Sequence, residues 1–177
     1  WVSDITYWKI EERYTYISLI TDAYSHKIVG YHLAQTLESV ETIKALRLAL
    51  TQLPNQINKP LIHHSDRGVQ YCSDNYVKLL QDKAIEISMT ENGDPLENAI
   101  AERINGILKS EYLKHYSPRN FQEAKEYLQV AVKLYNQDRP HFSIGLLTPN
   151  EVHSKNINVE KLWKNYYNKN TKIVNPV

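Results

Sequence analysis

Three acidic side chains, Asp4, Asp66 and Glu102, occupy positions that could support metal chemistry. Asp4 lies in the middle of a stretch that predicts a β-strand, where aspartate is depleted. Asp66 ends a short apolar stretch, and Glu102 lies in a segment with helical spacing. The intervals are 61 residues between Asp4 and Asp66 and 35 between Asp66 and Glu102. Clustered carboxylates repel one another, but they are the oxygen ligands that Mg²⁺ prefers. Two such ions, about 4 Å apart, can drive phosphodiester chemistry.

The elements that must position these acids follow from the hydrophobic pattern. Apolar and β-branched runs predict strands at residues 1–10, 14–22, 27–34, 60–65 and 86–90. Helical spacing predicts helices at residues 39–53, 75–83, about 96–113 and 121–136. Three hairpin-connected strands followed by alternating helices and strands predict an α/β fold. We expect a mixed five-stranded sheet with helices on both faces, which brings a strand acid, a strand-end acid and a helix acid to one edge.

The predicted helix around Glu102 carries a polar stripe on one side and apolar residues on the other. At 100° per residue, the stripe within about 60° of Glu102 consists of Asn98, Asn105, Gly106 and Lys109. Glu97 is the competing acid, but Asp94-Pro95-Leu96-Glu97 has the pattern of an N-terminal capping box with proline at the first helical position. The pattern therefore favours Glu102 as the helix acid of the site.

Composition describes a globular chain with one cysteine, Cys72. Of its 177 residues, 42% are hydrophobic and 23% charged, and the net charge is only +1. No apolar run approaches 18 residues, so no membrane span is predicted, and one cysteine cannot form an internal disulfide. With no signal-peptide pattern, a cytoplasmic location is expected.

Local charge favours a polyanion partner more than the net charge does. Residues 103–119 and residues 151–177 each carry an excess of +3, which suits a phosphate backbone. In the first of these segments and on the polar stripe, we expect DNA contacts from Arg103, Asn105 and Lys114. We expect residues 1–150 to form the domain and residues 151–177 to form a basic C-terminal tail.

Several stretches, taken in order, resemble the catalytic core of DDE transposases and integrases. They are residues 1–7 (WVSDITY), 22–30 (DAYSHKIVG), 63–71 (HHSDRGVQY), 97–103 (ENAIAER), 135–141 (YNQDRPH) and 148–151 (TPNE). The resemblance is to the insertion-sequence-three family of bacterial transposases and to the related retroviral integrases. It covers roughly residues 1–152.

The resemblance implies an RNase H-like fold in which Asp4, Asp66 and Glu102 bind Mg²⁺ or Mn²⁺, as two ions. It also implies that Lys109, seven residues after Glu102, contacts DNA near the transposon end. Members of the family cut DNA at element ends and join the freed 3′-OH to target DNA. The implied partners are therefore transposon ends, target DNA and at least a second copy of the chain, in a bacterial, nucleoid-associated setting. The chain opens at Trp1 inside a predicted strand, and the family's helix-turn-helix region does not precede it, so we expect a fragment.

Other interpretations remain open at this stage. The chain could be a stand-alone RNase H-like nuclease, or a non-catalytic DNA-binding or assembly module derived from a transposase. His63 and His64 could indicate a soft metal site, although strand-end packing is favoured. Tyr112 and Tyr116 could contact DNA. For Arg139-Pro140-His141, a DNA contact and a turn are equally plausible, and Asp22 is expected to stabilise a turn.

Overall fold

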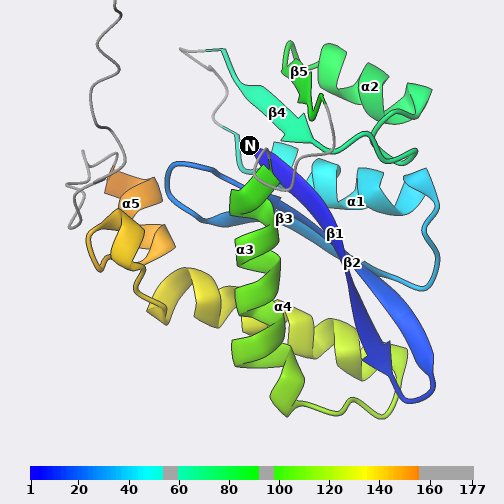
Figure 1. Cartoon of the computed structure of the whole chain (residues 1–177), viewed down its shortest axis with the longest axis vertical. Helices are drawn as coiled ribbons and strands as arrows, with labels where there is room; N and C mark the ends of the chain where they lie inside the picture. Colours follow the sequence, from blue (N-terminus) through cyan, green and yellow to red (C-terminus); the bar gives the residue numbers. More distant parts are fainter. Residues whose placement is uncertain (54–59, 92–97, 156–177) are drawn as a thin grey trace, which may run out of the picture.

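A computed structural model describes residues 1–53, 60–91 and 98–155, which fold around one five-stranded mixed sheet (Figure 1). Its strands are β1 (Val2–Ile10), β2 (Arg13–Thr21), β3 (Ile28–Ala34), β4 (Ile62–Ser65) and β5 (Glu86–Met89). The strand order is β3-β2-β1-β4-β5, antiparallel among β1, β2 and β3 and parallel from β1 to β4 to β5. The expected mixed sheet is confirmed, with strand ends shifted by one or two residues.

The β1–β2 hairpin has the longest register in the sheet. Nine pairs run from Val2 opposite Thr21 to Ile10 opposite Arg13, and a two-residue turn joins the strands. Glu11 in that turn has φ 51°, the left-handed conformation that lets a two-residue hairpin match the twist of its strands. By contrast, β1 pairs with β4 only at Val2 and His64, so the rest of that edge of β1 is not covered by β4.

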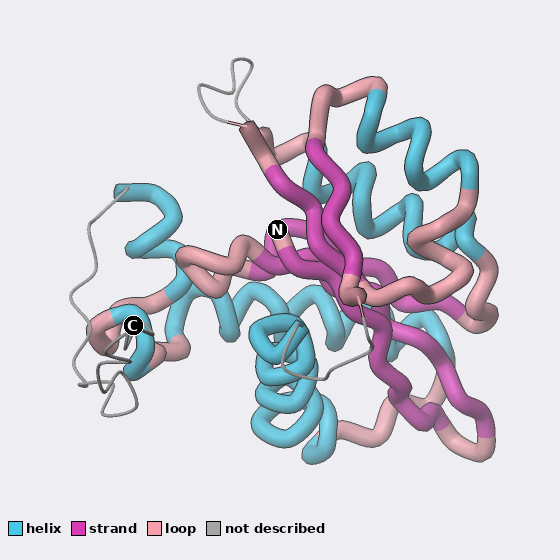
Figure 2. Tube along the Cα trace, turned by 45° about the horizontal axis from the view of Figure 1, so that its top comes forward, coloured by secondary structure: helices cyan, strands magenta, loops and turns pink. Residues whose placement is uncertain are grey.

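Helices cover both faces of the sheet (Figure 2). They are α1 (Ser39–Leu50), α2 (Asp74–Gln81), α3 (Ala99–Ile107), α4 (Phe121–Asp138) and α5 (Pro149–Lys155). The helices α1 and α2 pack on one face, and α3 and α4 on the other. Val40, in the first turn of α1, is 47% exposed and lines the groove between α1 and α2.

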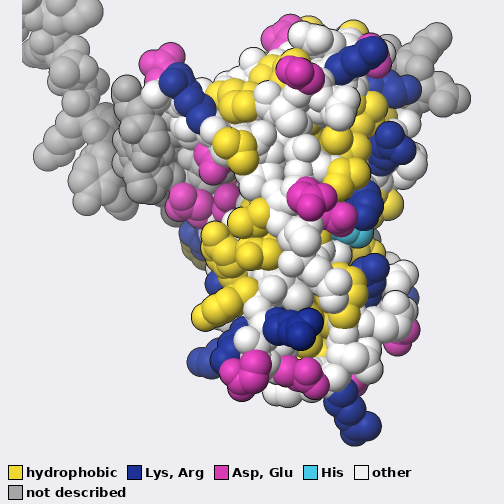
Figure 3. All heavy atoms as spheres, turned by 90° about the vertical axis from the view of Figure 1, so that its right-hand side faces the viewer, with side chains coloured by type: hydrophobic (Ala, Val, Ile, Leu, Met, Phe, Trp, Pro, Cys, Tyr) yellow, Lys and Arg dark blue, Asp and Glu magenta, His cyan; other side chains and the backbone are white. Residues whose placement is uncertain are grey.

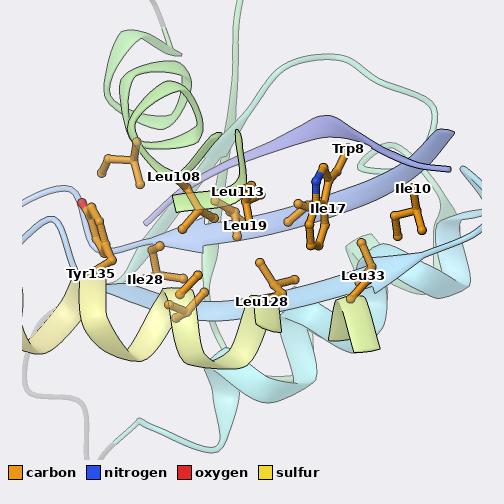
Figure 4. Packing of buried hydrophobic residues seen from close by; sticks show 14 residues of the cluster. Trp8, Ile10, Ile17, Leu19, Ile28, Leu33, Leu108, Leu113, Leu128 and Tyr135 are labelled. Atoms are coloured by element: carbon orange, nitrogen blue, oxygen red, sulfur yellow. The ribbon is translucent and has the colours of Figure 1, made fainter. Parts of the chain in front are cut away.

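Alternation along the strands separates the two hydrophobic cores. Ile17 and Leu19 of β2 face α3 and α4, whereas Ile20 faces α1. Figure 4 shows the first core, in which Leu128 and Tyr135 of α4 lie against the strands. At Gly30 of β3 a Cβ would lie 2.3 Å from a backbone oxygen of α1, so only glycine allows the close approach of α1 to the sheet.

The helix expected to continue to Leu113 changes its geometry after Ile107. A π-helical turn, Leu108–Tyr112, is followed by a 3-10 turn, Leu113–His115. The N–H of Leu113 donates to the carbonyl of Leu108, five residues earlier. Single π turns inside α-helices are uncommon and are frequent at functional sites.

The folded part extends beyond the domain boundary predicted at residue 150. Helix α5 crosses that position, and its Val152 is buried. The predicted basic tail lies mostly outside the described residues, as do Glu97 and its capping box. In the described part of the chain, no helix has the length and apolarity needed to cross a membrane.

Candidate active site

Asp4 lies on β1, and Asp66 lies just past the end of the neighbouring parallel strand β4. Asp4 is two residues after Val2, and Asp66 is two residues after His64, the partner of Val2. Because side chains alternate along a strand and neighbouring strands lie about 4.8 Å apart, both carboxylates belong to the same face of the sheet. They line one pocket of about 160 Å³, together with Ile5, Tyr7, Leu37, Gln70 and Tyr71. The predicted convergence of the two strand acids is therefore present.

Asp4 is half-buried in an environment that disfavours its charge. Burial is the largest effect and raises the pKa of its carboxyl group. The neighbouring carboxylates of Asp66 and Glu102 raise it further, whereas a hydrogen bond from Asn105 lowers it. Both other acids therefore repel the charge of Asp4, and a cation bound among the three carboxylates would relieve this repulsion.

Asp66 is exposed just past the end of β4, and backbone geometry fixes its orientation. The N–H of Gly68 donates to Oδ1 of Asp66 at 2.9 Å. A Cβ at Gly68 would lie 3.0 Å from that same oxygen, so a side chain there would crowd the carboxylate. The other Asp66 oxygen, Oδ2, has no hydrogen-bond partner in the part of the chain that the structure describes, which leaves it able to bind a ligand.

Helix α3 docks on β1 through two amides that lie two turns apart. Nδ2 of Asn98 donates to the backbone oxygen of Ser3 at 3.0 Å, and Nδ2 of Asn105 donates to Oδ2 of Asp4 at 2.7 Å. Glu102 lies between these amides on the same side of the helix, which directs it toward Asp4.

The burial of Asn105 argues against its predicted contact with DNA. Its side chain is only 4% exposed, and its amide nitrogen is committed to Asp4. The two amides of the predicted polar stripe, Asn98 and Asn105, face β1 rather than solvent. Asn105 therefore acts on the site by holding Asp4.

The three acids suit a magnesium or manganese ion by their chemistry, since all three offer hard oxygen ligands. The structure brings Asp4 and Asp66 into one pocket, and Glu102 is close enough to raise the pKa of Asp4. Within residues 1–53, 60–91 and 98–155, however, no three His, Cys, Asp or Glu side chains are close enough together to hold one ion. Asp4 and Asp66 are thus the two acids that line the pocket, and the exposed Glu102 lies beside it.

Lys109 and Lys114 line a larger groove beside the acids, whereas Arg103 lies elsewhere. The groove, of about 640 Å³, lies between the β1–β2 hairpin and the turns that follow α3. Arg103 is exposed and lowers the pKa values of His26 and His141, which places it toward the start of β3. Two of the basic residues expected to contact DNA therefore share one surface.

The paired histidines at the end of β4 have structural partners. Nε2 of His63 is 3.0 Å from the hydroxyl of Tyr76, and burial lowers the pKa of His63 to about 3. Nδ1 of His64 lies 2.9 Å from Oγ of Ser88. These contacts match the packing role favoured by the sequence rather than a soft metal site.

Other candidate residues also have contacts within the fold. Asp22 accepts hydrogen bonds from the backbone and hydroxyl of Ser25, both at 2.7 Å, which stabilises the turn before β3. Tyr116 stacks on Tyr127 with ring centroids 3.7 Å apart. Arg139 forms a two-point ion pair with Glu111, which favours its structural interpretation.

The sheet order and the helices on both faces, with Asp4 on the central strand β1 and Asp66 just past the end of β4, define an RNase H-like α/β fold. Two family models of the integrase core domain match the chain, one over residues 1–95 and the other over residues 83–149. The chain belongs to the integrase core domain family.

Similar proteins come from bacterial insertion sequences. The chain is 37% identical over 154 residues to an uncharacterized 31 kDa protein of insertion element IS600 from Shigella sonnei, covering 84% of this chain and 54% of that protein. It is 30% identical over 159 residues to the transposase InsF of insertion sequence IS3A from Escherichia coli, with 89% and 54% covered. The chain therefore spans about half the length of these curated relatives.

Solved structures of viral integrases share the fold. The HTLV-2 integrase catalytic core domain, in complex with magnesium, has a TM-score of 0.67 at 22% identity, with 86% of this chain and 93% of that chain covered. A simian T-cell lymphotropic virus intasome in complex with the PP2A regulatory subunit B56 gamma gives 0.73 at 21% identity, with 90% and 56% covered.

Proposed function

We propose that this chain is the catalytic core of a transposase that cuts DNA and joins the freed end to target DNA. The observation that carries the proposal is the shared pocket of Asp4 and Asp66, flanked by Glu102 on α3. Membership of the integrase core domain family and the insertion-sequence relatives support it.

Asp4, Asp66 and Glu102 would hold Mg²⁺ or Mn²⁺, as two ions. Bound ions would supply an activated nucleophile and stabilise the departing oxygen. The chain's own contribution is positional: Asn105 holds Asp4 through Oδ2, and Gly68 holds Asp66 through Oδ1. The related HTLV-2 core was solved with magnesium, which supports divalent metal use.

DNA is the proposed substrate, as transposon end and as target. Lys109 and Lys114 would contact phosphates beside the acids, and Arg103 would act from its separate position. Joining two element ends requires at least two cores, so a homodimer or higher oligomer is proposed. The dimeric and trimeric forms of the HTLV-2 core support this. Such an enzyme would act at the bacterial nucleoid.

The test is Asp66→Asn in the full-length transposase, with Glu86→Gln as the control. Both residues are exposed acids of the same sheet. Asp66 follows the end of β4, whereas Glu86 begins β5 and does not line the pocket. Asp66→Asn should reduce strand transfer in Mg²⁺ by more than the roughly 10- to 100-fold typical of losing an outer-shell partner. Thermal unfolding of both variants should match the wild type, because surface changes usually alter stability by less than about 0.5 kcal/mol.

The same assay separates the alternatives. Wild-type strand transfer by Asp66→Asn would refute the assignment. Cleavage by the wild type without joining, when a 3′-OH transposon end and target DNA are both supplied, would indicate a nuclease. Absence of Mn²⁺ binding, or Mn²⁺ binding unchanged in Glu102→Gln, would favour a non-catalytic module.

A further inference from the structure

The groove beside the acids combines positive charge with exposed aromatic rings. Its lining residues are Tyr7, Trp8, Lys9, Tyr14, Gly106, Lys109, Ser110, Leu113, Lys114, Tyr116 and Ser117. Three of them are lysines and none is acidic. Figure 3 shows basic, acidic and hydrophobic side chains interspersed over the face on the right of Figure 1. The lining of this groove, with its volume of about 640 Å³, is thus complementary to a polyanion.

Two tyrosines of the hairpin present open ring surface to this groove. Tyr7 is 53% exposed and Tyr14 is 63% exposed. Their rings meet edge to face, with centroids 6.4 Å apart and an angle of 84° between planes. Tyr7 also rests edge to face on Tyr16, its cross-strand partner, at 5.4 Å. The rings are therefore supported from the side and offer exposed surface on which a planar group can stack.

The π turn explains why two lysines reach the same groove. In an uninterrupted α-helix, residues five apart point about 140° away from each other. Lys109 and Lys114 are five apart, yet both line the groove. The hydrogen bond from Leu113 to Leu108 spans the same five-residue interval, so the wider turn brings Lys114 around to the side of Lys109.

The groove and the acidic pocket share one lining residue. Tyr7 lines both the groove and the pocket that contains Asp4 and Asp66. Tyr7 is three residues after Asp4 on β1, a distance of about 10 Å along a strand. A linear molecule lying in the groove would therefore pass over Tyr7 into the pocket.

We propose that this groove binds a single-stranded DNA segment and leads it to the acids. Its bases would stack on Tyr7 and Tyr14, and its phosphates would contact Lys9, Lys109 and Lys114. Alternating aromatic rings and cations are the pattern of single-strand binding sites, because every unpaired base has a free face for stacking. In a duplex these faces are covered by neighbouring bases, so the tyrosines distinguish the two forms of DNA.

The choice of DNA as the ligand of this groove rests on the proposed function, but the binding test does not require catalysis. Binding of a fluorescein-labelled oligo-dT of about 12 nucleotides is measured by anisotropy in EDTA, with the whole 177-residue chain. A duplex and an RNA of the same length are the comparison ligands. If Asp66→Asn later proved active, the catalytic assignment would fail while this binding result would stand.

Tyr14→Ala should weaken binding of the single strand about tenfold, equivalent to ~1.4 kcal/mol, within the range for one stacked base. Tyr14→Phe should restore it, since the ring remains. Duplex binding should change by less than a factor of two to three. Phe142→Ala is the matched control, because Phe142 is 55% exposed and does not line the groove.

Lysine variants test the phosphate contacts independently. Lys114→Gln should lower the slope of log affinity against log salt by about 0.7, the value for one contact to a single strand, and Tyr14→Ala should leave the slope unchanged. Wild-type affinity in Tyr14→Ala, or equal weakening of single strand and duplex, would overturn the proposal. Tighter binding of the RNA than of the DNA would overturn the assignment to DNA.

Discussion

The hydrogen bond from Asn105 to Asp4 offers a sharp test of how the fold prepares the site. Asn105→Ala removes the donor 2.7 Å from Oδ2 of Asp4. Asn98→Ala is a closely matched control. It makes the same truncation on the same side of α3, but removes a bond to the backbone oxygen of Ser3. Both amides are buried, and the Oδ1 atom of each has no hydrogen-bond partner among the described residues.

The two bonds should differ in magnitude and in kind. A hydrogen bond to a charged group contributes about 1.5–3 kcal/mol, against about 0.5–1.5 kcal/mol for a neutral one. At 1.4 kcal/mol per tenfold, loss of the Asn105 bond corresponds to about a 10- to 100-fold weaker Mn²⁺ affinity, the range found for partners of metal ligands. Asn98→Ala should lower stability by about 1 kcal/mol and leave ion affinity nearly unchanged.

The pH dependence gives a second signature. The Asn105 bond lowers the pKa of Asp4, so its removal lets that pKa rise further above the ordinary aspartate value. An ion must then displace a proton from a larger fraction of the molecules. The affinity defect of Asn105→Ala should be greatest at low pH and shrink as pH increases.

Calorimetric Mn²⁺ titrations of both variants, repeated from about pH 6 to about pH 8, make the comparison. Equal affinities and parallel pH profiles for Asn105→Ala and Asn98→Ala would refute the reasoning. A defect in Asn105→Ala that did not vary with pH would show that the bond orients Asp4 without favouring its charge.

Three further substitutions test stability, measured by chemical unfolding. Gly30→Ala should destabilise the fold by about 1–3 kcal/mol through overpacking, because its Cβ would meet a backbone oxygen of α1 at 2.3 Å. Gly106→Ala, where a Cβ meets nothing within 4 Å, should instead stabilise it by up to about 1 kcal/mol; a loss in Gly106→Ala comparable to that in Gly30→Ala would contradict the packing argument. Glu111→Gln should cost at most ~1 kcal/mol at pH 7, since the pair with Arg139 is partly solvated. The hydrogen bond from Arg139 lowers the pKa of Glu111, so this difference is fully present above the ordinary glutamate pKa of about 4.3 and is lost as pH falls through the lowered pKa of the folded state; a difference that did not shrink as Glu111 became protonated would exclude the ion pair as its cause.

The sheet was largely predictable because its strands carry strong β patterns. Strands enriched in Ile, Val, Thr and Tyr, with hairpin breaks at Glu11-Glu12 and before Lys27, define β1, β2 and β3 to within a residue or two. The structure also explains the spacing of Asp4 and Asp66, because each lies two residues after a member of the parallel pair Val2 and His64. The strand pattern therefore predicted that the two acids lie at one edge of the sheet.

The direction of the polar stripe on α3 was harder to predict. Periodicity groups Asn98 with Asn105, but it does not say which neighbour the group meets. Both amides hold β1, nearly one hundred residues earlier in the chain, whereas Asn105 had been expected to contact DNA.

The groove escaped prediction for two reasons. Tyrosine is common in strands, so the sequence indicated only β propensity at Tyr7 and Tyr14. Alternation along the strands does place both side chains on the exposed side. A helical wheel drawn at 100° per residue cannot represent a π turn, so it did not predict that Lys109 and Lys114 line the same groove. Only tertiary structure brings the tyrosines and lysines together.

The hairpin register has a consequence for the order of folding. Within five residues, β1 supplies the carbonyl of Ser3 that anchors α3, the acid Asp4 and the ring of Tyr7. Hairpins close in about 1–10 μs, so these three groups acquire their correct faces early. The link from Asp4 to Asn105 spans 101 residues and can close only after most of the chain is in place. We therefore expect hydrogen exchange to protect the hairpin before α3, and the bond between Asn105 and Asp4 to be among the last contacts that the folding chain forms.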